Sequence, residues 1–171
     1  MVSKISLRKK VMKRRKNMNA ADFNKASKLI CDHLINFADW QNINSVLVYL
    51  PIAGNREVDI SPFINYLLKL PSNLQIFVPD FDRKNPVHFK FRSLKDDDFV
   101  NYADFEIVIV PALAVDKNKY RLGYGGGYYD RLLHKYPRAR TITPIFSQDV
   151  FESIPHETHD EIVDAVITEV S

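Results

Sequence analysis

The chain is organised around the stretch RLGYGGGYYD, which runs from Arg121 to Asp130. The sequence contains only five glycines, and this stretch holds Gly123, Gly125, Gly126 and Gly127. Because glycine costs backbone entropy in a folded domain, such a cluster predicts a backbone conformation that other residues cannot adopt. We therefore expect a specialised loop here rather than an ordinary connection.

The sequence on either side of this loop predicts regular structure. The apolar run EIVIVP at 106–111 is typical of a buried strand, and residues 128–133 have helical spacing. A strand, a glycine-rich loop and a helix start form a cradle whose backbone N–H groups face an anion such as phosphate. Arg121 at the entrance and Asp130 at the exit would suit a phosphate-binding cation and a Mg²⁺ carboxylate.

Two other interpretations of the loop are possible. The spacing G-x-G-G-G matches neither the P-loop, which ends in Lys-Ser/Thr, nor the G-x-G-x-x-G of dinucleotide folds. A tight turn with several positive φ angles would also use glycines. A turn, however, requires neither the flanking charges nor the paired tyrosines Tyr128 and Tyr129. The phosphate cradle is therefore the favoured interpretation.

Length and composition indicate one domain, residues 1–171, with 46% hydrophobic residues. No apolar run approaches the ~20 residues of a membrane helix, and the first residues lack the apolar core of a secretory signal. The single cysteine, Cys31, excludes an internal disulfide, and its apolar neighbours predict a buried thiol rather than a nucleophile. We expect a cytoplasmic protein without a membrane partner.

The first segment is strongly basic, because every charged side chain before Asp22 is Lys or Arg. Such an arm can indicate a nucleic acid, an anionic membrane or an organelle address. Alternatively, Ile5, Leu7, Val11 and Met12 form a partial apolar stripe on a helix, with the charges as its solvated face. The residues alone leave both interpretations open.

Helix and strand patterns alternate along the rest of the chain. A helix is predicted over Ala20–Phe37, and another begins with Ser61 as its cap and Pro62 in its first turn, ending at Pro71. Strands are predicted over Ser45–Leu50, Gln75–Pro79, Val87–Phe91, Thr141–Phe146 and Val163–Thr168. The alternation predicts a three-layer α/β/α sandwich with a mostly parallel, Rossmann-like sheet, whose ligands lie at the carboxyl ends of the strands.

Taken together, several motifs resemble the 5-formyltetrahydrofolate cyclo-ligase family. The glycine loop RLGYGGGYYDR resembles the signature of that family, and KISLR at 4–8 matches its K-x-x-x-R helix. The segments NREVD at 55–59, VPALAVD at 110–116 and PHETHD at 155–160, with the later VD and ITE, resemble further family motifs. The resemblance covers nearly the whole chain.

The resemblance implies conversion of 5-formyltetrahydrofolate to 5,10-methenyltetrahydrofolate, with ATP and Mg²⁺ as cofactors and with release of ADP and phosphate. By resemblance, Arg121 and Glu57 act in catalysis, and Asp130 and Asp164 hold Mg²⁺. The implied nucleotide contacts are Lys4, Arg8, Arg121, Leu122, Gly123, Tyr124, Gly125, Gly126, Gly127, Tyr128 and Tyr129. The implied folate contacts are Leu50, Glu57, Tyr124 and Tyr128.

One departure from the family pattern affects the loop. Tyr124 and Gly126 stand where some branches of the family carry basic residues, so the cation that contacts the transferred phosphoryl group stays open. The expected partner is a folate, possibly polyglutamylated, and not a nucleic acid. The expected assembly is a monomer or a small homo-oligomer.

Two rival functions and two rival metal sites follow from the same residues. A sugar-phosphate isomerase could use the same sheet and loop without consuming ATP, and the basic segment could belong to a non-catalytic nucleic-acid-binding module. His156, His159, Asp160 and Asp164 imitate a zinc site but lack a matching ligand set elsewhere. The run Asp96–Asp98 is better explained as a solvated turn.

Overall fold

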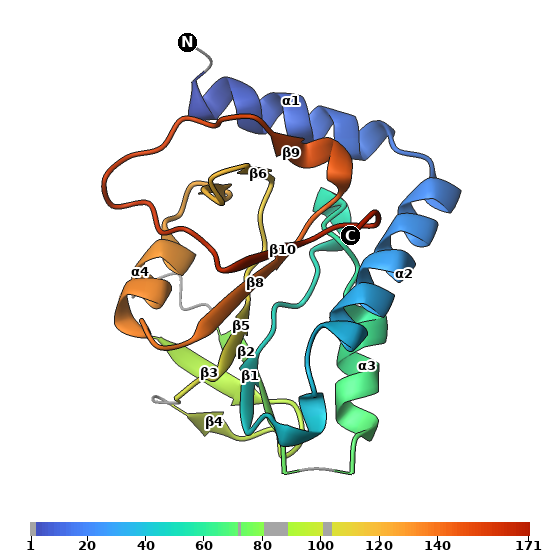
Figure 1. Cartoon of the computed structure of the whole chain (residues 1–171), viewed down its shortest axis with the longest axis vertical. Coiled ribbons are helices and arrows are strands. Elements are labelled where there is room, and N and C mark those ends of the chain that lie inside the picture. The colour runs from blue at the N-terminus through green and yellow to red at the C-terminus, as the bar shows by residue number, and fades with distance from the viewer. Residues whose placement is uncertain (1–2, 72, 81–88, 101–103) are drawn as a thin grey trace.

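The computed structural model describes residues 3–71, 73–80, 89–100 and 104–171. In these residues a sheet lies between helices on its two faces, with a further helix across one end (Figure 1). The helices are α1 (Lys4–Asn17), α2 (Ala20–Phe37), α3 (Ser61–Lys69) and α4 (Tyr128–Lys135). Short 3₁₀ helices are η1 (Trp40–Asn42), η2 (Ala53–Asn55) and η3 (Ser147–Asp149). No helix of the described ranges is long and apolar enough to cross a membrane.

The main sheet has the strand order β10-β8-β5-β1-β2-β3-β4. Its strands are β1 (Ser45–Leu47), β2 (Gln75–Asp80), β3 (Lys90–Ser93), β4 (Phe99–Val100), β5 (Ile107–Ile109), β8 (Arg140–Pro144) and β10 (Ala165–Ile167). Pairing is parallel from β10 to β2 and antiparallel where β3 joins β2 and β4 joins β3. The predicted three-layer, mostly parallel α/β fold is therefore confirmed.

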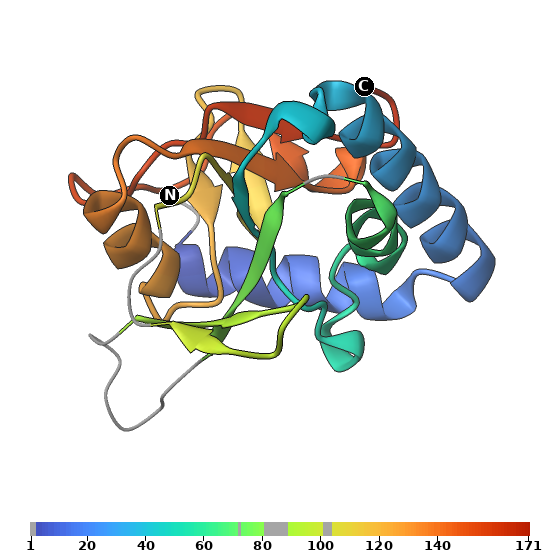
Figure 2. The same cartoon turned by 90° about the horizontal axis from the view of Figure 1, so that it is seen from below.

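The two faces of the sheet are buried by different helices. Successive residues of a strand point to opposite faces, so Val46 packs with the core beneath α2 and α3, and Leu47 packs with the core beneath α4. Figure 2 shows α2 and α3 on one side of the sheet and α4 on the other. Cys31 belongs to the first core, and burial raises the pKa of its thiol to about 11, so it stays protonated.

A second, three-stranded sheet was not predicted from the sequence. Its order is β7-β6-β9, from the strands β6 (Ala114–Asp116), β7 (Arg121–Leu122) and β9 (Val150–Phe151). Because these strands have two or three residues each, they are too short to produce a periodic pattern. The glycine loop follows β7 of this small sheet, and not the predicted strand at 106–111 directly.

Several predicted boundaries differ from those in the structure. The strand predicted over Ser45–Leu50 pairs only to Leu47, although the Val48 amide still donates to the Phe77 carbonyl at 2.8 Å. The cap of α3 is Ile60 rather than Ser61, and the Ser61 amide is satisfied by the Asp59 carboxylate. In the strand predicted over Val87–Phe91, Val87 and His88 lie outside the described residues.

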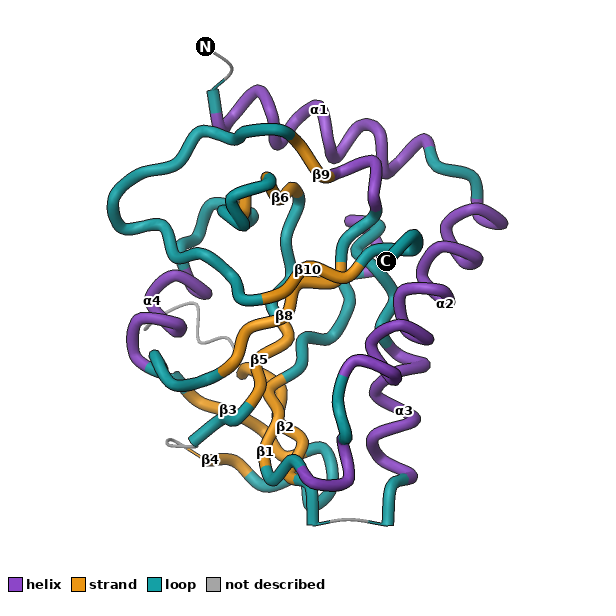
Figure 3. The backbone as a smooth tube through the Cα atoms, in the orientation of Figure 1, coloured by secondary structure: helices purple, strands orange, loops and turns teal. Residues whose placement is uncertain are grey.

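The helix α1 crosses the molecule near the carboxyl ends of the parallel strands (Figure 1). Its buried residues are Leu7, Val11 and Arg15, whereas Ile5 is 65% exposed. The apolar stripe predicted from the sequence is thus present but shifted toward Arg15. Figure 3 shows the segment between β9 and β10 running as a loop past the start of α1 and toward α4.

Candidate active site

A cleft of about 880 Å³ lies between α1, the loop after β1, the glycine loop and the segment before β10. Its volume is within the range of small-molecule sites. All the residues predicted from the sequence to contact nucleotide or folate line this cleft. Of the two predicted metal ligands, Asp130 lines it and Asp164 does not. Lining residues that the sequence predictions missed are Tyr49, Ile52, Pro79, Pro111, Glu157, His159 and Asp160.

The glycine loop takes left-handed backbone conformations at two of its residues. Gly125 has a φ of +106° and Gly127 a φ of +60°, and Gly127 is the N-cap of α4. Gly126 has no such constraint, and a Cβ added there would meet no described atom within 4 Å. The N-terminus of α4 leads out of the loop, and the dipole of this helix favours an anion there.

Arg121 brings a buried positive charge to the floor of the loop. Its side chain is 2% exposed, and Nη2 donates to Asp130 Oδ1 at 2.7 Å. Burial lowers the pKa of the guanidinium, and the charge of Asp130 opposes that shift. Among the described residues, no hydrogen-bond partner reaches the buried Arg121 Nε. A buried cation with an unused donor suits an anionic ligand.

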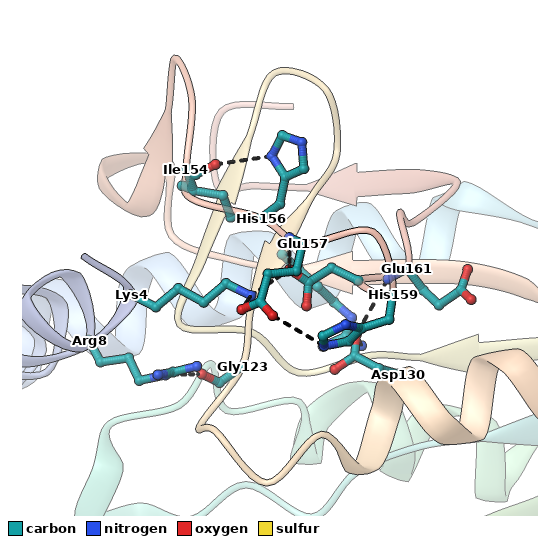
Figure 4. Close-up of polar contacts among 11 residues, drawn as sticks. Lys4, Arg8, Gly123, Asp130, Ile154, His156, Glu157, His159 and Glu161 are labelled. Atoms are coloured by element: carbon teal, nitrogen blue, oxygen red, sulfur yellow. Dashed lines mark hydrogen bonds and ion pairs between the residues drawn. The ribbon is translucent and has the colours of Figure 1, made fainter. Parts of the chain in front are cut away.

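The helix α1 supplies two more cations from one of its faces. Lys4 and Arg8 are one turn apart, and Ser3 caps the helix by accepting from the Ser6 amide. Arg8 Nε donates to the Gly123 carbonyl at 2.9 Å. Lys4 Nζ reaches Glu157 Oε1 at 3.1 Å (Figure 4). These cations hold the loop and the segment before β10 beside the helix.

Glu57 contributes a buried carboxylate to the cleft. It is 5% exposed, and its Oε2 accepts from the Ile52 amide at 2.6 Å. The Tyr124 hydroxyl lies close to it, and burial together with the Glu57 charge raises the pKa of that hydroxyl. Leu50 and Ile52 are 51% and 55% exposed, so apolar surface borders the carboxylate.

Asp164, the second predicted Mg²⁺ ligand, does not line the cleft, and its carboxylate contacts the main sheet. Asp164 Oδ2 accepts from the Thr141 amide at 2.7 Å and from the Thr141 hydroxyl at 2.8 Å, so Asp164 supports the start of β8. Asp160, four residues earlier, does line the cleft with Asp130, as do Glu57 and Glu157. The Mg²⁺ site predicted from Asp130 and Asp164 stays a prediction, and Asp160 is a second candidate for the partner of Asp130.

The described residues do not form the zinc arrangement considered from the sequence. His156 stacks on Tyr120 with ring centroids 3.8 Å apart, and its Nδ1 lies 3.3 Å from the Ile154 carbonyl (Figure 4). Within the described part of the chain, no three His, Cys, Asp or Glu side chains gather as a metal site. The run Asp96–Asp98 forms a turn between β3 and β4, as predicted.

Comparison with known proteins points to one family. A model of the 5-formyltetrahydrofolate cyclo-ligase family matches residues 1–169. A 5-formyltetrahydrofolate cyclo-ligase from Mycoplasma genitalium is 31% identical over 134 residues, 78% of either chain. One from Mycolicibacterium smegmatis is 41% identical over 64 residues, 37% of this chain and 33% of that protein.

A solved structure has the same fold. A 5,10-methenyltetrahydrofolate synthetase from Mycoplasma pneumoniae superposes with a TM-score of 0.83 at 24% identity, over 97% of this chain and 98% of that one. The family match covers nearly the whole chain and includes every residue that lines the cleft. The chain therefore belongs to the 5-formyltetrahydrofolate cyclo-ligase family and is an enzyme.

Proposed function

We propose that this enzyme converts 5-formyltetrahydrofolate to 5,10-methenyltetrahydrofolate, using ATP and Mg²⁺ and releasing ADP and phosphate. The observation that carries the proposal is a single cleft lined both by a cationic glycine loop and by the buried carboxylate of Glu57. The first feature suits the phosphates of ATP, and the second suits the N–H edge of a pterin. Two substrates can thus lie side by side in the cleft.

The nucleotide is proposed to lie against the glycine loop. Lys4, Arg8 and Arg121 line the cleft there, and the backbone N–H groups of residues 123–127 add uncharged donors. The unused Nε of buried Arg121 supports this assignment, because burying a charged donor without an acceptor is costly. Phosphoryl transfer depends mostly on positioning and charge neutralisation, which these groups are able to provide.

Mg²⁺ is proposed to bind between Asp130 and Asp160. Both carboxylates line the cleft, and both contribute to the negative field at Arg121. Mg²⁺ prefers oxygen ligands and keeps several waters, so one or two carboxylates together with phosphate oxygens suffice. A site with few protein ligands agrees with the absence of a larger acidic cluster in the described ranges.

The folate is proposed to lie between Glu57 and the tyrosines of the loop. A carboxylate can accept hydrogen bonds from the pterin, and the rings of Tyr124 and Tyr128 offer flat surfaces for stacking. Leu50, half exposed beside Glu57, gives apolar contact area. This arrangement places the pterin near Arg121, where the phosphates are proposed to end.

The reaction explains why the cleft needs binding groups rather than a nucleophile. A formamide carbonyl is a poor electrophile, and ATP supplies a phosphoryl group that makes the formyl oxygen a leaving group. N10 then bonds to the formyl carbon and loses its proton as the C–O bond breaks and phosphate departs. The chain holds the two substrates together and neutralises charge, mainly through Arg121, Lys4 and Arg8.

The direct test is to incubate the protein with ATP, Mg²⁺ and 5-formyltetrahydrofolate and to follow the amidinium chromophore of the product. We expect one ADP and one phosphate for each product molecule, and no product when ATP is omitted. Product formation without ATP consumption, or no product under any condition, would contradict the proposal. ATP-independent turnover of a sugar phosphate would support the isomerase alternative. Salt-dependent RNA binding that ATP does not affect would support the nucleic-acid-binding alternative.

The remaining expectations concern the tail of the substrate and the assembly. Lys9, Lys10 and Lys13 are exposed on α1, the helix whose Arg8 lines the cleft. Their charge is complementary to the carboxylates of a polyglutamylated folate, and comparing KM for mono- and polyglutamylated substrate tests this. A cytoplasmic monomer or small homo-oligomer stays our proposal, which cell fractionation and light scattering would test.

A further inference from the structure

The helix α1 carries two of the cations proposed to bind ATP, so its exact placement decides whether they reach the phosphates. We propose that Arg15 and Asp149 are positioning residues, whose buried ion pair fixes α1 so that Lys4 and Arg8 are held at the nucleotide. The inference rests on the proposed function. Neither Arg15 nor Asp149 lines the cleft, so their effect would act through α1.

Arg15 is an unusual residue for a basic helix because it is almost completely buried. It is 1% exposed and Asp149, in η3, is 0% exposed. Arg15 Nε donates to Asp149 Oδ2 at 2.7 Å, and Nη2 donates to the carbonyls of Ala112 and Leu113 at 2.9 and 3.0 Å. Its guanidinium carbon also lies 5.6 Å from the ring centroid of Phe146. One side chain thus connects α1 to two separate segments, the one before β6 and the one around η3.

The directional character of these contacts matters more than their number. Leu7 and Val11 also pack α1 against the core. Apolar contacts are non-directional, however, so they tolerate small sliding or rotation of a helix. The planar guanidinium has fixed donor directions, so three simultaneous hydrogen bonds define both the rotation and the axial position of α1. Because a buried ion pair contributes little net stability compared with an apolar pair of similar volume, a role in geometry explains its presence better.

The contacts of Arg15 are made with the segment that leads into the glycine loop. Ala112 and Leu113 directly precede β6, and the Leu113 amide donates to the Leu122 carbonyl at 2.7 Å in β7. Residue 122 is followed by Gly123, whose carbonyl accepts from Arg8 Nε at 2.9 Å. Arg8 and Arg15 are two helical turns apart, about 10 Å. The helix is therefore joined to the same small sheet and its loop at two separated points.

The ion pair of Arg15 and Asp149, called the anchor below, includes a second cation from α1. Arg14 Nη2 pairs with Asp149 Oδ1, so both carboxylate oxygens are used by neighbouring residues of α1. The Arg14 side chain is 31% exposed and its guanidinium lies over the Phe151 ring at 5.6 Å. Asp149 thus faces two cations from α1, and Arg15 is the one that reaches the interior.

The test compares Arg15→Met with Lys16→Met. Both changes remove one positive charge from adjacent positions of α1, but Lys16 is exposed whereas Arg15 is buried. We expect Arg15→Met to raise KM and Kd for ATP by ~10-fold or more, since small misplacements of binding groups are costly. KM for the folate should change little, and Lys16→Met should behave like the wild type. Measurements are made well below the melting temperature of each variant.

Additional variants guard against a failure to fold. Arg15→Met leaves Asp149 buried with less compensation, so the double variant Arg15→Met with Asp149→Asn removes the charge of both partners. Arg15→Lys keeps the positive charge but loses the planar guanidinium with its fixed donor directions. Compared with Arg15→Met, we expect this variant to recover more of the stability than of the ATP affinity. A purely structural role predicts lower melting temperatures with unchanged KM for ATP in the folded protein, and that result would overturn the inference.

A measurement without nucleotide separates this inference from the proposed function. Amide hydrogen exchange of residues 4–11 should be faster in Arg15→Met than in Lys16→Met, because the anchor holds this part of α1 against the loop. If the wild type fails to bind ATP, the proposed function is wrong, and faster exchange in Arg15→Met alone still supports the anchor. Equal exchange in the two variants overturns it.

Discussion

Lys4 and Asp160 form an ion pair beside the cleft, with Nζ 2.5 Å from Oδ2. The two residues are 156 positions apart in sequence, and their contact joins the start of α1 to the segment before β10. In the proposed function the Lys4 ammonium binds a phosphate of ATP, and the Asp160 carboxylate binds Mg²⁺. Binding of Mg²⁺ and ATP would therefore exchange this ion pair for contacts with the ligands.

The first prediction concerns the titration of Asp160. Burial acts to raise the pKa of this carboxyl, but the hydrogen bonds from Lys4 and from the Glu157 amide outweigh it and lower the pKa. The stabilisation is therefore present at neutral pH and is lost as the pH falls through the lowered pKa, below about pH 4. We expect Lys4→Met to raise the pKa of Asp160, as measured by NMR titration of the carboxyl carbon.

The exposed Lys9 on the same helix supplies the control for this titration. Lys9→Met removes the same charge without touching Asp160, so it should leave the pKa of Asp160 nearly unchanged. The pKa of Lys4 is raised in turn, because its hydrogen bonds to the two carboxylates outweigh burial, which acts in the opposite sense. Equal titration curves in Lys4→Met and wild type would contradict the ion pair.

The second prediction separates Asp160 from Asp164 in metal binding. We expect Asp160→Asn to bind Mg²⁺ more weakly, because it loses a charge-assisted contact. The Mg²⁺ concentration that gives the half-maximal rate should rise by ~10-fold or more. Asp164→Asn should keep the metal dependence of the wild type, because its carboxylate serves Thr141. It should instead lower the melting temperature. A metal defect in Asp164→Asn with normal behaviour of Asp160→Asn would reverse the assignment.

The third prediction separates the two substrates through Glu57. Glu57→Gln keeps the shape of the side chain but removes the charge that is proposed to accept the pterin N–H groups. Losing one such charge-assisted hydrogen bond costs about 1.5–3 kcal/mol, so KM for the folate should rise ~10- to 100-fold. Kd for ATP, measured by calorimetric titration, should stay near the wild-type value. Loss of ATP binding with intact folate binding would refute the assignment.

The fourth prediction uses two neighbouring glycines of the loop. Gly125→Ala adds a Cβ at a φ of +106°, so it strains the loop even without ligand, and the Arg8 guanidinium lies 3.6 Å from that Cβ. Gly126→Ala meets open space and no such strain, so the melting temperature should stay unchanged. We expect Gly126→Ala to lose ATP affinity if phosphate approaches the backbone at Gly126.

The comparison distinguishes a phosphate cradle from an ordinary turn. A turn would make Gly125→Ala costly in stability and Gly126→Ala neutral in every measurement. A cradle makes both variants weak in ATP binding, with only Gly125→Ala destabilised. Calorimetric titration of ATP into the two folded variants, beside thermal unfolding, decides between them.

The sequence by itself determined the class of fold and most of the residues that line the candidate cleft. Apolar runs that alternate with helical patterns are local properties of the chain, so the layered sheet could be predicted from adjacent residues such as Val46 and Leu47. The demand for glycine in the loop is also local, because a left-handed φ at Gly125 concerns the backbone of that residue. This loop is also one of the motifs that resemble the cyclo-ligase family.

Only the tertiary structure showed that Asp160, and not Asp164, lines the cleft with Asp130. Asp160 and Asp164 lie in the same irregular segment, and no periodicity tells which of them faces the cleft. That orientation depends on contacts with distant residues, since Lys4 holds Asp160 and Thr141 holds Asp164. The role of Arg15 is hidden for the same reason: it is one basic residue among many in α1, and only the packing against Asp149 buries it.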